Sequence, residues 1–151
     1  MNSIYRTILS SLLSEKEIKE IADIDNACKY DSDVYKLLCS KGCFLFADWA
    51  EGTNYFDDFC SFVNLRLNAF SEYSIKDFDK ENFLNTLNGR KFKGDTMILL
   101  LEHFKKEIEV KDFVILNLDC NDDTYRLCIT NVLCAKHLNS IDFMEGKFVT
   151  L

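Results

Sequence analysis

The stretch DFVILNLDCNDDTYRLCIT, residues 112–130, decides the fold. Two runs rich in β-branched, aliphatic and aromatic residues, DFVILNLD and DTYRLCIT, flank a short polar segment, and this pattern predicts a β-hairpin. Its tip carries Asp119, Asp122 and Asp123 with no basic residue between them. Turn chemistry by itself favours Asn121 and Asp122 at such a tip. The tip therefore raises the question of whether its acids also serve a metal, catalysis or a partner.

Helices are expected before the hairpin. Ser14 and Glu17 have the spacing of a capping box and predict a helix over 14–24. A second helix, over about 32–41, is expected to end at Gly42. The short apolar run CFLFADW, residues 43–49, predicts a buried strand.

A longer helix is expected to follow that strand. It is capped by Asn54, and one apolar stripe runs along it through Phe56, Phe59, Cys60, Val63, Leu67 and Phe70. Residues 72–79 predict a weaker strand and residues 80–89 a short helix. A further helix over about 95–108 is predicted by the stripe Met97, Leu100, Leu101, Phe104 and Ile108.

The C-terminal segments SIDFM and KFVTL, separated by EG, are expected to add edge strands. With 48% hydrophobic residues, a chain of 151 residues can bury a sizeable core. The sequence therefore predicts a single α+β domain over residues 1–151. In it, N-terminal helices precede a mixed or mostly antiparallel sheet with a C-terminal β-meander.

The net charge of −7 is unevenly distributed. Residues 31–60 carry six acids and two bases, and residues 112–123 carry four acids and no base. If the strands before these acidic loops run parallel, both loops lie at one end of the sheet and form one negative face; if they run antiparallel, the patches are split. Both arrangements remain open. The candidate contact residues are Asp48, Trp49, Glu51, Asp57, Asp58, Asp119, Asp122, Asp123 and Tyr125.

Metal and cofactor sites are not expected. Asp119, Asn121 and Asp123 have the alternating spacing of a calcium loop, but Thr124 and Thr130 stand where such a loop needs glycine and glutamate. The cysteines form no CxxC pair that favours zinc. No phosphate-binding glycine motif is present.

The seven cysteines lie mostly in apolar runs and are odd in number, which favours a reducing compartment, and we expect the cytoplasm. A small hydrolase that uses a thiol and a histidine, such as Cys134 with His137, stays an alternative. The acidic balance opposes nucleic-acid binding, and the basic segment GRKFKG, residues 89–94, is expected to be a solvated loop. No apolar run is long enough to span a membrane.

Three segments resemble an uncharacterised bacterial α+β domain family. They are FLFADW at 44–49, GD at 94–95 opening a helix, and DDTYRLCI at 122–129. In that family a strand ending in Asp-Trp precedes a helix, and a late hairpin closes the sheet. The resemblance covers about residues 43–130 and implies no activity.

In overall character, acidic, compact and without a catalytic motif, the whole chain resembles the immunity proteins of bacterial contact-dependent-inhibition and polymorphic toxin systems. This resemblance implies a cytoplasmic protein without enzymatic activity that neutralises a basic toxin, for example a nuclease, and it assigns no residue. We expect a monomer or a weak homodimer. A structural or regulatory module, paired through its KFVTL strand, remains a further alternative.

Overall fold

The computed structural model describes residues 2–48, 55–71, 74–75, 79–87 and 93–151. The first helices are α1 Ser3–Leu12, α2 Glu15–Lys19, α3 Ile24–Ala27 and α4 Asp31–Ser40. Strand β1 Leu45–Asp48 and helices α5 Phe56–Ser71, α6 Lys80–Leu87 and α7 Lys93–Glu109 follow. The chain continues with β2 Phe113–Asp119, β3 Thr124–Asn131, α8 Val132–Leu138, β4 Asp142–Phe143 and β5 Gly146–Thr150.

The strands form one sheet in the order β1-β3-β2-β5-β4, and each neighbouring pair is antiparallel. The α+β class and the late hairpin are therefore as expected. Helix α8 separates β3 from β4. Of the two C-terminal strands expected at an edge of the sheet, only β4 lies at one. Strand β5 is internal, because it pairs with β2 on one side and with β4 on the other.

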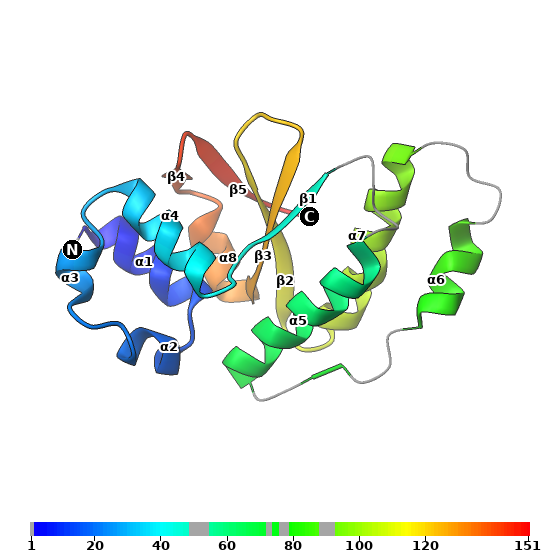
Figure 1. Cartoon of the computed structure of the whole chain (residues 1–151), viewed down its shortest axis with the longest axis horizontal. Coiled ribbons are helices and arrows are strands. Elements are labelled where there is room, and N and C mark those ends of the chain that lie inside the picture. Colours follow the sequence, from blue (N-terminus) through cyan, green and yellow to red (C-terminus); the bar gives the residue numbers. More distant parts are fainter. Residues whose placement is uncertain (1, 49–54, 72–73, 76–78, 88–92) are drawn as a thin grey trace.

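Helices cover both faces of the sheet, with α1, α4 and α8 on one side and α5, α6 and α7 on the other (Figure 1). Alternate strand residues serve the two sides. On β2, Ile115 packs against the α5–α7 side, whereas Leu116 and Leu118 pack against the α1–α4 side. The central strand β2 is therefore buried from both faces, which explains its almost continuous apolar sequence.

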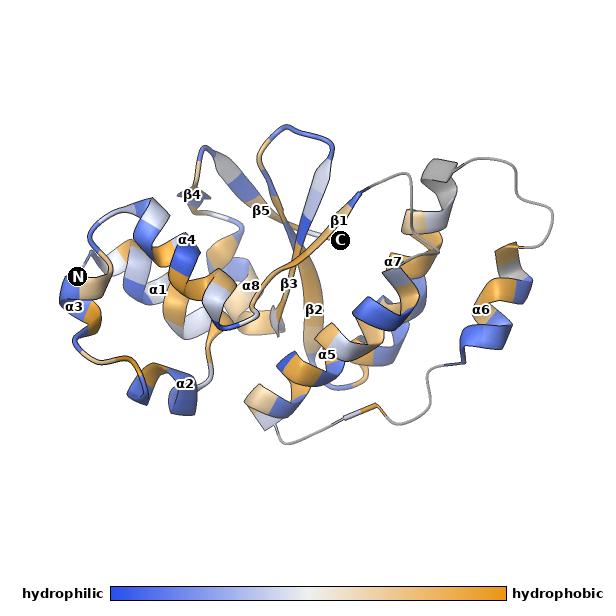
Figure 2. Cartoon of the chain, in the orientation of Figure 1, coloured by the Kyte–Doolittle hydropathy of each residue, from blue (hydrophilic) through white to orange (hydrophobic). Residues whose placement is uncertain are grey.

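The apolar stripes predicted for the long helices form the core of the α5–α7 side. On α7, Met97, Leu100, Leu101, Phe104 and Ile108 are all buried, as expected. On α5, the stripe holds at Phe56, Phe59, Val63 and Leu67, and Phe62 joins it. Figure 2 shows these apolar residues alternating with hydrophilic ones along both helices. Asn54, the expected cap of α5, and most of the weak strand expected over 72–79 lie outside the described residues.

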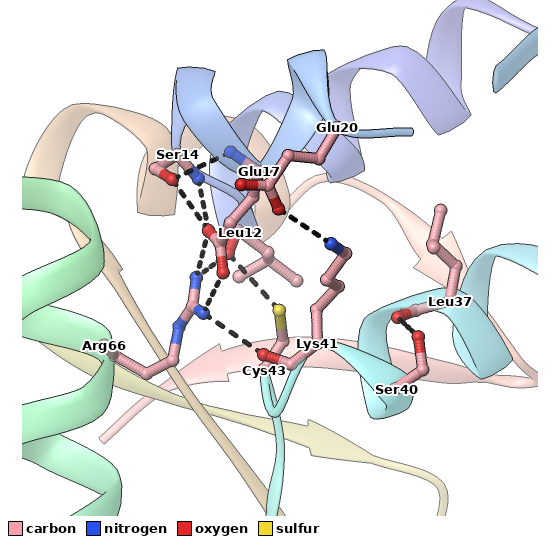
Figure 3. Close-up of polar contacts among 9 residues, drawn as sticks. All are labelled: Leu12, Ser14, Glu17, Glu20, Leu37, Ser40, Lys41, Cys43 and Arg66. Carbon is pink, nitrogen blue, oxygen red and sulfur yellow. Dashed lines mark hydrogen bonds and ion pairs between the residues drawn. The ribbon is translucent and has the colours of Figure 1, made fainter. Parts of the chain in front are cut away.

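Arg66 is the exception on α5, because its side chain is only 1% exposed. Its guanidinium donates to both carboxylate oxygens of Glu17, at 2.8 and 3.2 Å, and to the Leu12 carbonyl at 2.6 Å (Figure 3). Glu17 also accepts the Ser14 backbone N–H of the predicted capping box. This buried ion pair joins α5 to the turn between α1 and α2.

The helix predicted over 14–24 is wrong beyond Lys19. Helix α2 ends there, and Asp23 adopts the left-handed backbone conformation with a φ of 51° before the short α3 begins. The isoleucines of this segment still pack inward, against the α1–α4 core. Helix α8, which the sequence reading did not anticipate, begins where the Asn131 side chain accepts the Cys134 N–H.

Two glycines meet specific backbone requirements. Gly42 has a φ of +66°, a conformation that glycine adopts without strain, and it ends α4 as predicted. At Gly146, a Cβ atom would collide with the Asp119 backbone carbonyl, so glycine permits β5 to lie closely against the end of β2. Among the described residues, no helix combines the length and apolarity needed to cross a membrane.

Candidate functional site

Strands β1 and β2, each of which ends in an aspartate, end at the same end of the sheet. Strands β1 and β2 both run antiparallel to β3, so they run in the same direction and their carboxyl ends coincide. Asp48 at the end of β1 lies opposite Thr124, directly after the hairpin tip. Of the two arrangements left open by the sequence, the common end is therefore the one that forms.

The turn between β4 and β5 adds further acids at this end. In the sheet, Lys147 of β5 lies opposite Asp119 of β2 on one side and opposite Asp142 of β4 on the other. We call the resulting group the acidic sheet end; its described carboxylates are Asp48, Asp119, Asp122, Asp123, Asp142 and Glu145. Figure 2 shows the loop between β2 and β3 and the turn before β5 as hydrophilic, at the top of the view. The sequence reading did not include Asp142 and Glu145, although the EG turn between two short apolar runs was a usable signal.

The remaining predicted contact residues divide into two groups. Asp57 and Asp58 lie in the first turn of α5, where the helix dipole favours acids. The Tyr55 hydroxyl accepts the Asp48 backbone N–H at 3.3 Å, which holds this helix start beside the acidic sheet end. Asp57 is neutralised by Lys80. Trp49 and Glu51 lie outside the described residues.

The hairpin splits open below its tip. The β2–β3 ladder ends at Asn117 and Leu127; beyond it the end of β2 pairs with β5 and the start of β3 pairs with β1. The Asn117 side chain accepts the Arg126 backbone N–H at 2.8 Å, where the next ladder bond would otherwise form. The opening is a hollow of about 250 Å³, lined by Asn117, Asp119, Asp122, Asp123, Thr124 and Tyr125.

Asp122 serves the structure of the tip itself. Arg126 donates to both of its carboxylate oxygens, at 2.8 and 2.6 Å, and the Thr124 N–H adds a third hydrogen bond. The Arg126 hydrogen bonds, together with the one from Thr124, lower the pKa of Asp122 to about 2. The same contact raises the pKa of Arg126. The predicted role of Asp122 as a free contact carboxylate is therefore weakened by a partner within its own loop.

Other carboxylates at this end are less occupied. Asp119 accepts the Asn121 N–H at 2.9 Å in a local turn, with Asn121 at a φ of 58°. In the described part of the chain, Asp119, Asp123 and Glu145 form no ion pair. Their side chains are exposed to solvent on two adjoining segments, the hairpin tip and the turn between β4 and β5.

Metal ligation has no geometric basis here. Across the described residues, no three His, Cys, Asp or Glu side chains converge as metal ligands. In addition, Arg126 donates to both carboxylate oxygens of Asp122.

Six of the seven thiols have a raised pKa, which opposes activation. Burial raises the pKa of Cys43 to about 12 and that of Cys60 to about 11, and it raises the pKa of Cys28, Cys39, Cys120 and Cys128 as well. A nucleophilic cysteine needs the opposite shift, towards the thiolate. The buried Nε2 atom of His103 has no hydrogen-bond partner, and the ring lies among Phe56, Phe83 and Phe104.

Comparison with known proteins adds no relative from which a function could be transferred. No protein-family model, curated protein or solved structure matches the chain.

Proposed function

We propose that the protein is an immunity-type inhibitor, which binds a basic toxin, a nuclease domain in particular, and covers its cleft with the acidic sheet end. One observation carries the proposal. Carboxylates from the hairpin tip, the end of β1 and the turn before β5 gather at one end of the sheet. Three of them, Asp119, Asp123 and Glu145, form no ion pair with a described residue.

Charge complementarity explains why such an arrangement suits this task. A nuclease attracts the phosphates of its substrate with lysine and arginine side chains. A protein that presents carboxylates in their place is steered to the same cleft, which raises the association rate and sets the orientation. Tyr125 lines the hollow beside Asp119 and offers an aromatic surface of the kind that often dominates binding energy.

The proposal places the protein in the cytoplasm as a monomer or weak homodimer, with no enzymatic activity, cofactor or nucleic-acid ligand. The seven cysteines are all free, which agrees with a reducing compartment. A thiol hydrolase that uses Cys43 or Cys60 gains no support, because the raised pKa of each opposes the thiolate.

The first test is co-expression with the product of the gene immediately upstream. We expect the two proteins to co-purify and the toxicity of the upstream product to be relieved. The decisive variant is Asp119→Asn with Asp123→Asn, while Asp122 is kept because it pairs with Arg126. We expect association with the toxin to slow about tenfold at low salt, with little change in dissociation.

A matched control removes the same charge elsewhere. Glu107→Gln with Asp112→Asn acts in the last turn of α7 and just before β2, at the opposite end of the sheet, where neither carboxylate forms an ion pair with a described residue and asparagine tolerates the φ of 61° at position 112. This control should associate as the native protein does. Equal association rates for the Asp119/Asp123 variant and the control would contradict the proposal, as would toxicity that persists on co-expression.

A further inference from the structure

Beside α7, part of the sheet face is open to solvent. On this side α5 packs on β1 and β3, and α7 packs on β2. Strand β5 lies beyond them, and its residues facing this side are the cross-strand partners of β2 residues: Val149 lies opposite Asn117 and Lys147 lies opposite Asp119. Val149 is 44% exposed, and Ile98 on the neighbouring turn of α7 is 52% exposed.

Ile98 and Val149 border this open part of the sheet face, which we call the ledge; it lies on β5 beside α7. A hollow of about 260 Å³ is lined mainly by Ile98, Leu101, Ile115, Tyr125 and Leu151, with Glu102 and Lys105 at its rim. Tyr125 also lines the hollow at the hairpin tip, and Asp119 lines both that hollow and a third, of about 390 Å³, which reaches Val149. The ledge is therefore continuous with the acidic sheet end.

The dimensions of the ledge fit one α-helix. Strand β5 has five residues, which span about 17 Å, the length of about 11 helical residues. At the acidic end, where the two residues of β4 pair with Gly146 and Lys147, β5 and β4 together are about 10 Å wide, which is the usual distance between helices packed side by side. A helix placed there would continue the layer that α5 and α7 begin.

The charge of the ledge selects the occupant. The three hollows are lined by six carboxylates, those of Asp119, Asp122, Asp123, Asp142, Glu145 and Glu102, against the two ammonium groups of Lys105 and Lys147. Lys147 is paired with Asp142, Arg126 with Asp122 and Lys105 with Glu109, so four of the six carboxylates, Asp119, Asp123, Glu145 and Glu102, form no ion pair with a described residue. A second copy of this chain, with a net charge of −7, is disfavoured at such a surface, whereas a cationic helix is attracted.

We propose that a basic amphipathic helix of the partner protein lies along β5 beside α7, with its apolar stripe on Ile98, Val149 and Leu151 and its cationic side chains on the acidic sheet end. This inference rests on the proposed function and adds the structural element by which the partner is recognised. It follows the common pattern in which an amphipathic helix enters an apolar groove and charges around the groove set its direction.

The test uses the full chain and a synthetic helical probe. The probe is a fluorescent peptide of about 14 residues, with leucines at helical spacing and lysines on the other face. Its controls are a scrambled peptide of the same composition and a peptide with glutamate in place of lysine. We expect binding of the first peptide alone, and amide shifts in nuclear magnetic resonance spectra that map to β5 and to α7 around Ile98.

The variant that tests the ledge is Ile98→Gln with Val149→Thr; both side chains are about half exposed, so the fold tolerates the change. We expect the peptide to bind about 30-fold more weakly, because each site loses the burial of about half an aliphatic side chain. The matched control, Leu133→Gln with Val110→Thr, alters side chains that are 71% and 79% exposed at the opposite end of the sheet. It should bind as the native protein does.

Four results would each overturn the inference. The two double variants bind the peptide equally, or the scrambled peptide binds as well as the first one. The amide shifts map to other residues, or the mass in solution shows that two copies pair through the ledge. The toxin separates this failure from failure of the proposed function. If the Ile98/Val149 variant binds the toxin normally but the Asp119/Asp123 variant does not, the helix assignment fails and the proposed function stands. If neither variant affects toxin binding, both fail.

Discussion

The buried ion pair between Arg66 and Glu17 allows a quantitative prediction for Glu17→Gln. The Arg66 side chain is 1% exposed and that of Glu17 is 17% exposed, so water screens the pair little. Glutamine has the same shape, but it removes the negative charge and turns an N–H₂ group towards donors of Arg66 or Ser14.

The expected loss of stability follows from these contacts. Removing one partner of a buried pair costs about 3–5 kcal/mol, because the other charge is left uncompensated. The Leu12 carbonyl still accepts from Arg66 at 2.6 Å, which favours the lower end of the range. We therefore expect a loss of about 3 kcal/mol, equivalent to a fall in melting temperature of about 6–12 °C for a domain of this size.

Urea denaturation followed by circular dichroism measures this loss, and the chain supplies a matched control. Glu20 pairs with Lys41 at 3.3 Å, but its side chain is 53% exposed. Glu20→Gln should cost less than about 1 kcal/mol, since exposed pairs contribute little. The double variant Glu17→Gln with Arg66→Met should be more stable than the sum of its single variants predicts. A cost for Glu17→Gln no larger than that for Glu20→Gln would refute this reasoning.

Two further predictions concern titration and thiol chemistry. Because Arg126 holds the pKa of Asp122 at about 2, below the value of about 3.9 for an unfolded aspartate, its contribution to stability is present above about pH 4 and is lost as the pH falls through 2. A carbon-detected titration should place the Asp122 midpoint near 2 and Arg126→Gln should raise it; a midpoint that Arg126→Gln leaves unchanged would rule out this cause. Because burial raises the pKa of Cys43 to about 12 and that of Cys60 to about 11, iodoacetamide at neutral pH should alkylate them more slowly than free cysteine, whereas denaturant should remove the difference. A native thiol that reacts faster than free cysteine, found by mass spectrometry, would restore the hydrolase alternative.

Local patterns account for the parts of the fold that the sequence predicted correctly. The stripe of α7 depends only on helical spacing, and the capping box at Ser14 and Glu17 depends on residues three positions apart. The break after Lys19 was missed because it depends on where the inward-facing isoleucines find space, and on Asp23 accepting a left-handed backbone. Helix α8 has only seven residues, too few for a periodic signal.

By itself, the sequence determined that this is an acidic α+β chain, that its hairpin tip carries several carboxylates, and which helix faces are apolar. Only the tertiary structure decided that β1 and β2 run in the same direction on either side of β3, and therefore that Asp48 and Asp119 at their ends lie at the same end of the sheet. It also decided that Arg66 is buried and that Asp122 is paired within its own loop. The physical reason is range: turn and helix signals arise between near neighbours in the chain, whereas strand direction, burial of a charge and the surroundings of a carboxylate depend on segments far apart in sequence that meet only in the folded protein.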